Sequence, residues 1–322
     1  MSRVHDALRK AEQRQEPTAP ESAALAPGDV ASDPLSLALP EEGEIDTPAT
    51  RAEIPAFAGV VSRAEPRELK VDWRNFLSRC RTIPFRPAPE AHLVDIARPQ
   101  EAPGEEFRTL RTRLNHMQGQ QDLHAIVVTS ASPAEGKTFT AVNLALAQAQ
   151  LEHPVLLIDL DLRRPVVHNM VQCDRSPGFS DFLLGERRLE ECVRHIEGTN
   201  LYVMPAGTQV RNPLELLNMR HVKYSIDAFR KVFNWVILDT PPLLFSADAK
   251  LLATLTDGTL IVVRIGATTY DSVIRAMQSL CENNVLGIVA NGARAGELYS
   301  KYTYYYTKHE DESGNEDASR DE

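Results

Sequence analysis

A loop of small residues carries the most chemically suggestive pattern in this sequence. It follows an apolar run at 126–129, precedes an amphipathic stretch that starts at Lys137, and reads Ser-Ala-Ser-Pro-Ala-Glu-Gly-Lys-Thr over 130–138. An apolar strand, a tight loop and Gly-Lys-Thr at a helix start are typical of a phosphate-binding P-loop, although Ala131 replaces its first glycine. We expect backbone amides around the phosphates, the Lys137 amine on the outer phosphates, and the Thr138 hydroxyl on Mg²⁺.

Polar side chains stand where three other apolar runs end. Asp159 and Asp161 close the run 154–158, Asp239 closes 235–238, and Asn291 closes 285–290. In an open α/β sheet the carboxyl ends of the strands border the ligand crevice, so we expect these side chains near the P-loop. The carboxylates suit Mg²⁺ or the acceptance of a proton, and the Asn291 amide is expected to hydrogen-bond to a base.

The elements that must position these groups alternate along the chain. Strands are predicted at 126–129, 154–159, 201–207 (with a turn), 235–239, 258–264 and 285–291, with helical patterns between them, including most of 178–198. This alternation predicts an α/β fold of the P-loop NTPase type, a mostly parallel sheet covered by helices on both faces.

The N-terminal part has a different composition from the remainder. We predict a short helix at 1–15, a disordered tether at 16–90 rich in Pro, Ala, Glu, Ser and Thr, a P-loop domain at 91–298, and a tail at 299–322. The basic helix either folds on a partner or an anionic surface, or is a fraying end. Aromatic residues between 67 and 100 either dock on the domain or form a recognition segment, and the sequence favours neither.

Composition excludes several classes of function. The net charge of −10 argues against non-specific binding of nucleic acid. The four cysteines show no metal-like spacing and are expected to be reduced thiols of a cytosolic protein. No run approaches the ~18 apolar residues of a membrane span, and the N-terminus does not resemble a secretory signal.

A helix predicted from residue 104 carries Glu105, Arg108 and Arg111 at intervals of three. This spacing puts the three charges on one side of the helix, where they could pair with another subunit. Taken alone, the pattern is better explained as a solvated charged face.

Five of the eight tyrosines of the chain fall within eight residues near the C-terminus, at Tyr299, Tyr302, Tyr304, Tyr305 and Tyr306. The segment could be a final strand, a stacking surface for nucleic acid, or a set of phosphate acceptors. The acidic residues that follow disfavour nucleic acid. Phosphorylation would add close to two negative charges per site and could break an interface.

Together these motifs resemble the bacterial tyrosine kinases of the capsular exopolysaccharide type. The resemblance covers about residues 90–307 and lies in 130–138 (Walker A), 157–163 (Walker A′), 237–242 (Walker B), the Glu105, Arg108 and Arg111 pattern, residues 205–207 with 212–213, and the tyrosine-rich end. It implies an ATP- and Mg²⁺-dependent protein-tyrosine autokinase. Its nucleotide-contacting residues would be Ala134, Glu135, Gly136, Lys137, Thr138, Phe139 and Asn291.

The resemblance also implies specific roles. Thr138, Asp161 and Asp239 would surround Mg²⁺, Asp159 would accept the proton of the incoming tyrosine, and Arg163 belongs to the A′ motif. Glu105, Arg108 and Arg111 would mediate assembly into a ring, in which the tyrosines of one subunit enter a neighbouring site.

Further implied partners are a separate membrane activator and polysaccharide co-polymerase, which the basic helix could contact, and a phosphotyrosine phosphatase. The protein would be cytoplasmic and peripheral to the inner face of the membrane, and would regulate capsule or exopolysaccharide export.

Two other functions compete with this one. A MinD/ParA-like positioning ATPase has a related fold, but it typically carries an extra lysine near the start of its P-loop, and the sequence has none there. An assembly switch would bind ATP without phosphorylating tyrosine. Removal of the tail separates the kinase from both, since it should abolish phosphotyrosine and leave ATP binding intact.

Overall fold

The structure is a computed structural model, which describes residues 71, 73, 75–87, 92–94, 103–280 and 285–293. The expected N-terminal helix, the tether up to residue 70 and the five tyrosines of the tail lie outside these residues. Within the described part of the chain, no helix combines the length and apolar character needed to cross a bilayer.

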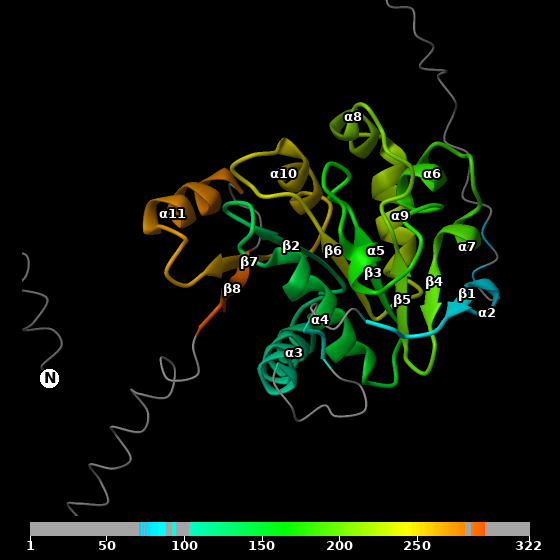
Figure 1. Ribbon diagram of the computed structural model, residues 1–322, viewed down its shortest axis with the longest axis horizontal. Helices are drawn as coiled ribbons and strands as arrows, with labels where there is room; N and C mark the ends of the chain where they lie inside the picture. Colours follow the sequence, from blue (N-terminus) through cyan, green and yellow to red (C-terminus); the bar gives the residue numbers. More distant parts are fainter. Residues whose placement is uncertain are drawn as a thin grey trace, which may run out of the picture. The chain divides into compact units, whose positions relative to one another are not determined.

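Eight described strands form one sheet in the order β1-β4-β5-β3-β6-β2-β7-β8, which runs from right to left in Figure 1. All strand pairs are parallel except β4 with β5. The strands are β1 (Arg81–Ile83), β2 (Ala125–Ser130), β3 (Val155–Asp159), β4 (Arg194–Ile196), β5 (Leu201–Met204), β6 (Trp235–Asp239), β7 (Gly258–Arg264) and β8 (Val285–Asn291). The predicted α/β class with a mostly parallel sheet is confirmed.

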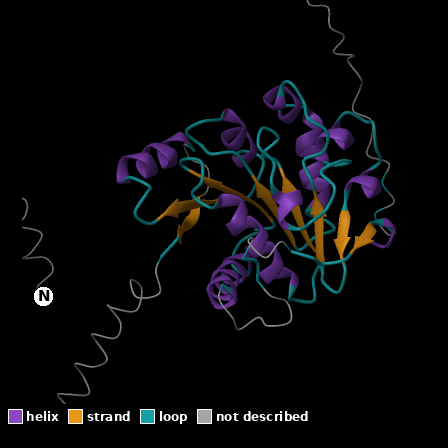
Figure 2. Ribbon diagram, in the orientation of Figure 1, coloured by secondary structure: helices purple, strands orange, loops and turns teal. Residues whose placement is uncertain are grey.

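Helices alternate with these strands and surround the sheet (Figure 2). They are α2 (Phe76–Arg79), α3 (Gly104–Gln118), α4 (Lys137–Ala149), α5 (Val167–Met170), α6 (Phe179–Leu183), α7 (Leu189–Cys192), α8 (Pro213–Leu217), α9 (Arg220–Phe229), α10 (Ala247–Ala253) and α11 (Tyr270–Ser279).

The central strands are apolar throughout because both of their faces are covered. Alternate side chains of β2 point to opposite faces: Val127 lies in a core with residues of α6, α7 and α9, whereas Ile126 and Val128 lie in a core with residues of α3 and α4. A parallel sheet buried on both sides reads as continuous apolar runs. This burial fixes β2, β3 and β6 side by side, so their carboxyl ends form one edge.

The segment 178–198 differs from the mostly helical expectation. It contains two helices, α6 and α7, of only five and four residues, followed by strand β4, which pairs antiparallel to β5. A strand as short as Arg194–Ile196 offers no clear periodicity, and its polar residues do not mark it as buried.

The predicted domain start at residue 91 lies after elements that belong to the sheet and its core. Strand β1 pairs with β4, and Phe76 of α2 is 1% exposed. Trp73 packs edge-on against Phe76 and Phe229, with ring centroids 5.4 and 6.3 Å apart. The aromatic residues at 73 and 76 therefore dock on the domain, which was one of the two alternatives left open by the sequence.

Candidate active site

The loop between β2 and α4 enters the helix through a glycine in the left-handed conformation. Gly136 adopts φ +98° directly before Lys137, the first residue of α4. A Cβ atom at this position would lie 1.9 Å from the Nδ2 atom of Asn291, so glycine is required both for the backbone and for space. Ala131 is not among the residues with positive φ, which explains why alanine is accepted in place of the first glycine.

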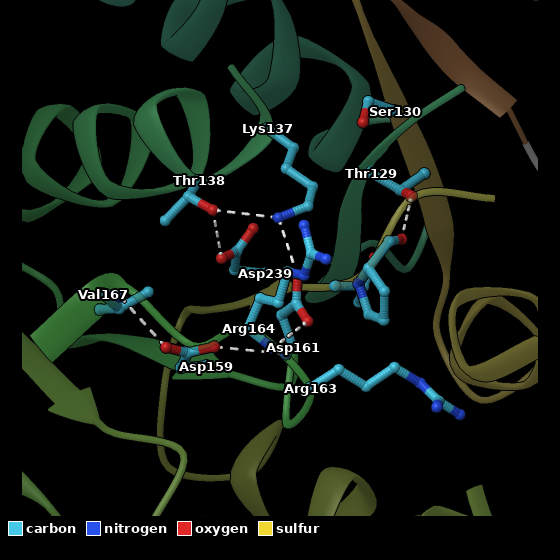
Figure 3. A network of polar contacts seen from close by, with 12 residues as sticks. Thr129, Ser130, Lys137, Thr138, Asp159, Asp161, Arg163, Arg164, Val167 and Asp239 are labelled. Carbon is cyan, nitrogen blue, oxygen red and sulfur yellow. Dashed lines mark hydrogen bonds and ion pairs between the residues drawn. The ribbon is translucent and has the colours of Figure 1, made fainter. Parts of the chain in front are cut away.

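Lys137 and Thr138 contact carboxylates from two other strand ends (Figure 3). The Lys137 amine lies 2.9 Å from Oδ2 of Asp161, and the Thr138 hydroxyl donates to Oδ2 of Asp239 over 2.7 Å. The Lys137 amine is also 3.3 Å from the Thr138 hydroxyl. The structure thus brings together Lys137 with Asp161, 24 positions apart, and Thr138 with Asp239, 101 positions apart.

Asp159 lies beneath this group and is fully buried. Its Oδ1 atom accepts from the Asp161 amide over 3.2 Å and its Oδ2 atom from the Val167 amide over 3.1 Å. Asp161 in turn accepts the Arg164 amide at Oδ1 over 3.0 Å. These hydrogen bonds fix the turn after β3, so both carboxylates have defined orientations.

Burial raises the pKa values of the Asp159 and Asp239 carboxyls, and repulsion between the carboxylates adds to it. Burial raises the pKa of Asp239 to about 6, against the opposing effect of the Lys137 cation. Burial, and next the carboxylate of Asp239, raise the pKa of Asp159 well above its usual value. Burial alone would lower the pKa of Lys137, yet the carboxylates of Asp239 and Asp161 outweigh it and the net pKa is raised. The lysine therefore stays charged at neutral pH.

The chemistry of this group fits a magnesium ion that is shared with phosphates. Oδ1 of Asp239 is buried and has no hydrogen-bond partner, while Oδ2 is held by Thr138. No set of three or more His, Cys, Asp or Glu side chains in the described residues forms a preformed metal site. Mg²⁺ is usually bound through one or two carboxylates together with substrate phosphates, so this arrangement is the expected one.

The remaining residues expected to contact the nucleotide lie around the loop and make different contacts. The Asn291 amide donates to the Glu135 carbonyl over 3.0 Å, which places the end of β8 at the P-loop. The Phe139 ring packs on Phe107, with centroids 5.9 Å apart, so its side chain is part of the core. Ala134 adopts φ +62°, a left-handed conformation that is unfavourable for alanine.

Two contacts of the site were not predicted from the sequence. Arg163, the arginine of the A′ motif, donates from Nε and Nη2 to the carboxylate of Asp248 over 2.8 and 3.2 Å. Asp248 is fully buried in the first turn of α10. The Thr268 hydroxyl donates to Glu135 over 2.6 Å. Such pairs join residues far apart in sequence, and no local pattern marks them.

The three charged residues of α3 do not all face solvent. Glu105 and Arg108 pair over 2.9 Å, whereas Nη1 of Arg111 donates to the Ala147 carbonyl over 2.8 Å and to Gln150 over 3.2 Å. Arg111 thus binds the C-terminal end of α4. Arg108 lines a groove of about 580 Å³ at that end of α4, together with Leu146, Ala149, Gln150, His195, Gly198, Thr199 and Asn200.

Comparison with protein families and characterised relatives agrees with this geometry. Residues 124–282 match the family model described as an AAA domain. The tyrosine-protein kinase YwqD of Bacillus subtilis is 34% identical over 221 residues, which cover 68% of this chain and 93% of that protein. The tyrosine-protein kinase etk of Escherichia coli K12 is 30% identical over 265 residues, 81% of this chain but 35% of that protein. The chain thus spans about a third of the longer relative.

Solved structures show the same relationship. The kinase domain of the E. coli tyrosine kinase ETK is 30% identical and superposes with a TM-score of 0.60, covering 66% of this chain and 89% of that one. The kinase domain of VpsO is 33% identical with a TM-score of 0.55, covering 58% and 93%.

Proposed function

The chain belongs to the bacterial tyrosine-protein kinases, and we propose that its P-loop site transfers the γ-phosphoryl group of ATP to tyrosines in the C-terminal segment of a neighbouring subunit. The observation that carries this proposal is the convergence of Lys137, Thr138 and three carboxylates, with one oxygen of Asp239 unpaired. Phosphoryl transfer depends mainly on positioning and on neutralising charge, and this set is suited to both.

Each residue then has a defined task. The loop amides and the Lys137 amine bind the ATP phosphates, and Thr138, Asp161 and Asp239 would hold Mg²⁺, which would neutralise phosphate charge when bound. Lys137 must exchange its contact with Asp161 for a phosphate oxygen. The raised pKa of Asp159 makes its carboxylate a stronger base, which suits it to accept the proton when a tyrosine hydroxyl attacks phosphorus and the bond to ADP breaks.

The acceptors in this proposal are Tyr299, Tyr302, Tyr304, Tyr305 and Tyr306. Ala134, Gly136 and Asn291 complete the site that binds ATP. Glu105 and Arg108 are the residues of α3 best placed for subunit contacts, because Arg108 lines the groove beyond α4. Arg111 contributes indirectly, by fixing α3 on α4.

In the cell we place the kinase in capsule or exopolysaccharide export, at the inner face of the membrane. A separate membrane activator and polysaccharide co-polymerase would recruit it, and a phosphotyrosine phosphatase would reset the tail. These assignments follow from membership of the family and from the resemblance in the motifs.

Removal of residues 299–322 tests the assignment of acceptors. The truncated chain should bind Mg-ATP like the full chain and form no phosphotyrosine, because only the acceptors are gone. Phosphotyrosine that persists in the truncated chain would contradict the proposal. A chain with Lys137→Met provides the matched control, since it keeps the acceptors and loses the phosphate ligand.

A further inference from the structure

An acidic side chain lies within the phosphate loop itself. Glu135 is 4% exposed, in a position where a carboxylate would repel phosphates if it faced them. Its Oε2 atom accepts from the Ser132 amide over 2.9 Å, and its Oε1 atom accepts from the Thr268 hydroxyl over 2.6 Å. Both oxygens are therefore bound by groups of the protein, one inside the loop and one outside it.

The tip of the loop is tied to the ends of β7 and β8 by further hydrogen bonds. The Thr268 hydroxyl accepts from the Arg264 amide over 2.8 Å, which places Thr268 in the turn after β7. Nη1 of Arg264 donates to the Ala134 carbonyl over 3.3 Å, and the Asn291 amide donates to the Glu135 carbonyl over 3.0 Å. Hydrogen bonds from the ends of β7 and β8 thus anchor the loop on one side of the site. Glu135 takes part in three of the five hydrogen bonds described for the loop.

We propose that Glu135 is a positioning residue, whose carboxylate holds the loop between Ser132 and Gly136 in its nucleotide-binding conformation by joining the Ser132 amide to the Thr268 hydroxyl. This inference rests on the proposed nucleotide site. A loop that is ordered before the ligand arrives loses less conformational freedom on binding, so the contacts of Glu135 increase the affinity for nucleotide. The carboxylate touches neither the phosphates nor the acceptor in this scheme, so the rate of transfer from bound ATP depends on it weakly.

A pair of substitutions at Thr268 tests the inference without altering a phosphate ligand. Thr268→Val keeps the shape of the side chain and removes the hydroxyl, whereas Thr268→Ser keeps the hydroxyl. Calorimetric titration of the full chain with Mg-ADP should show a Kd raised about tenfold or more in the valine variant, which loses the charge-assisted hydrogen bond to Glu135 and also the acceptor of the Arg264 amide. The Kd of the serine variant should stay close to that of the parent. Equal Kd values for the valine variant and the parent, or equal losses in both variants, would overturn the proposal.

A second variant separates an effect on nucleotide affinity from an effect on phosphoryl transfer. Glu135→Gln should raise the KM for ATP while kcat stays within about threefold, because affinity and not transfer is affected. Adding Thr268→Val to Glu135→Gln should then have less effect than it has in the parent, since the two groups act through one hydrogen bond. A fall in kcat at unchanged KM, or additive effects, would contradict the inference. Failure of the parent itself to bind Mg-ADP would instead overturn the nucleotide site as a whole.

Discussion

At the scale of single residues, the side chain of Asp239 shows the conflict between stability and function. It is fully buried, one of its oxygens has no partner, and burial raises its pKa from 3.8 to about 6. The folded carboxyl keeps its proton to a higher pH than the unfolded one. This group therefore lowers the free energy of unfolding as the pH rises from about 4 to about 6, and the loss persists at neutral pH.

Replacement of this carboxylate should stabilise the protein and inactivate it. A pKa difference of this size corresponds to ~3 kcal/mol, and Asp239→Asn should recover about 1–2 kcal/mol of it at pH 7.5, because Asn still accepts from Thr138. Denaturant unfolding without nucleotide would measure the gain, and phosphotyrosine formation should be lost. Asp248→Asn is the matched control: it removes the buried negative charge that pairs with Arg163 and one of the two acceptor oxygens, and it should lower stability. A lower stability in both variants would contradict the account.

The same carboxylates set the pH dependence of the reaction. In the proposed mechanism Asp239 must be ionised to bind Mg²⁺ and Asp159 to accept a proton, so kcat/KM for ATP should fall as the pH drops below the pKa of about 6 of Asp239. Protonation of Asp239 alone, with a pKa of about 6, should bring the value at pH 5 to about a tenth of that at pH 7.5, and protonation of Asp159 should lower it further. A profile that is flat between pH 5 and 7.5, measured while the fold stays intact by circular dichroism, would be inconsistent with these roles.

The two alanines of the P-loop should respond differently to glycine. Ala134 adopts φ +62°, whereas Ala131 does not have positive φ. A left-handed alanine costs about 1 kcal/mol, so Ala134→Gly should be neutral or stabilising, and Ala131→Gly should destabilise by about 0.5–1 kcal/mol through the entropy of the unfolded chain. The difference between the two free energies of unfolding is the quantity to measure. Equal effects would mean that the left-handed turn at 134 is absent in solution.

At the scale of elements, α3 and α4 are joined by Arg111. Its guanidinium donates to the Ala147 carbonyl and to the side-chain oxygen of Gln150 at the end of α4, where a cation also interacts favourably with the helix dipole. Arg111→Ala should therefore lower the free energy of unfolding by about 1–2 kcal/mol. Arg108→Ala removes only an exposed pair with Glu105 and should change stability by less than about 0.5 kcal/mol, while it weakens assembly. Thermal unfolding and light scattering on the same samples would show this split, and similar unfolding temperatures for the two variants would refute it.

Much of the fold was predictable because buried parallel strands have a continuous apolar sequence. The strands that hold the site, β2, β3, β6, β7 and β8, were all expected from such runs. Strands β1 and β4 were not, since three-residue strands with Arg and His or Thr lack that signal. Their position in the sheet is determined by pairing with each other and with β5, which only the folded chain reveals.

The site itself was predictable in part, for a similar reason. Topology dictates that acids at the ends of adjacent parallel strands approach the P-loop, so the group around Lys137 was foreseen. The contact of Glu135 with Thr268, and that of Arg163 with Asp248, depend on loop conformations and join residues 133 and 85 positions apart. The periodicity of α3 could show on which side of the helix Arg111 lies. It could not show that Arg111 contacts the end of α4.

At the scale of the whole molecule, the proposed acceptor tyrosines follow in sequence a strand that ends at the chain's own P-loop. Asn291 contacts Glu135, and Tyr299 comes eight residues later. Eight extended residues reach about 28 Å, so the length of the connection alone allows transfer within a subunit as well as between subunits. The proposed ring requires transfer between subunits. Identifying which chain is phosphorylated therefore distinguishes transfer between subunits from transfer within one subunit.

The most direct measurement mixes two full-length variants with Mg-ATP and maps phosphotyrosine by mass spectrometry. One variant carries Tyr→Phe at the five tail positions and keeps its site; the other carries Lys137→Met and keeps its tyrosines. The account predicts that neither variant, incubated by itself, is labelled in the tail. In the mixture, the Lys137→Met chain should acquire phosphate on Tyr299–Tyr306. ATP hydrolysis without phosphotyrosine in the mixture and in the parent would contradict the kinase assignment. Label in the parent but not in the mixture would contradict transfer between subunits.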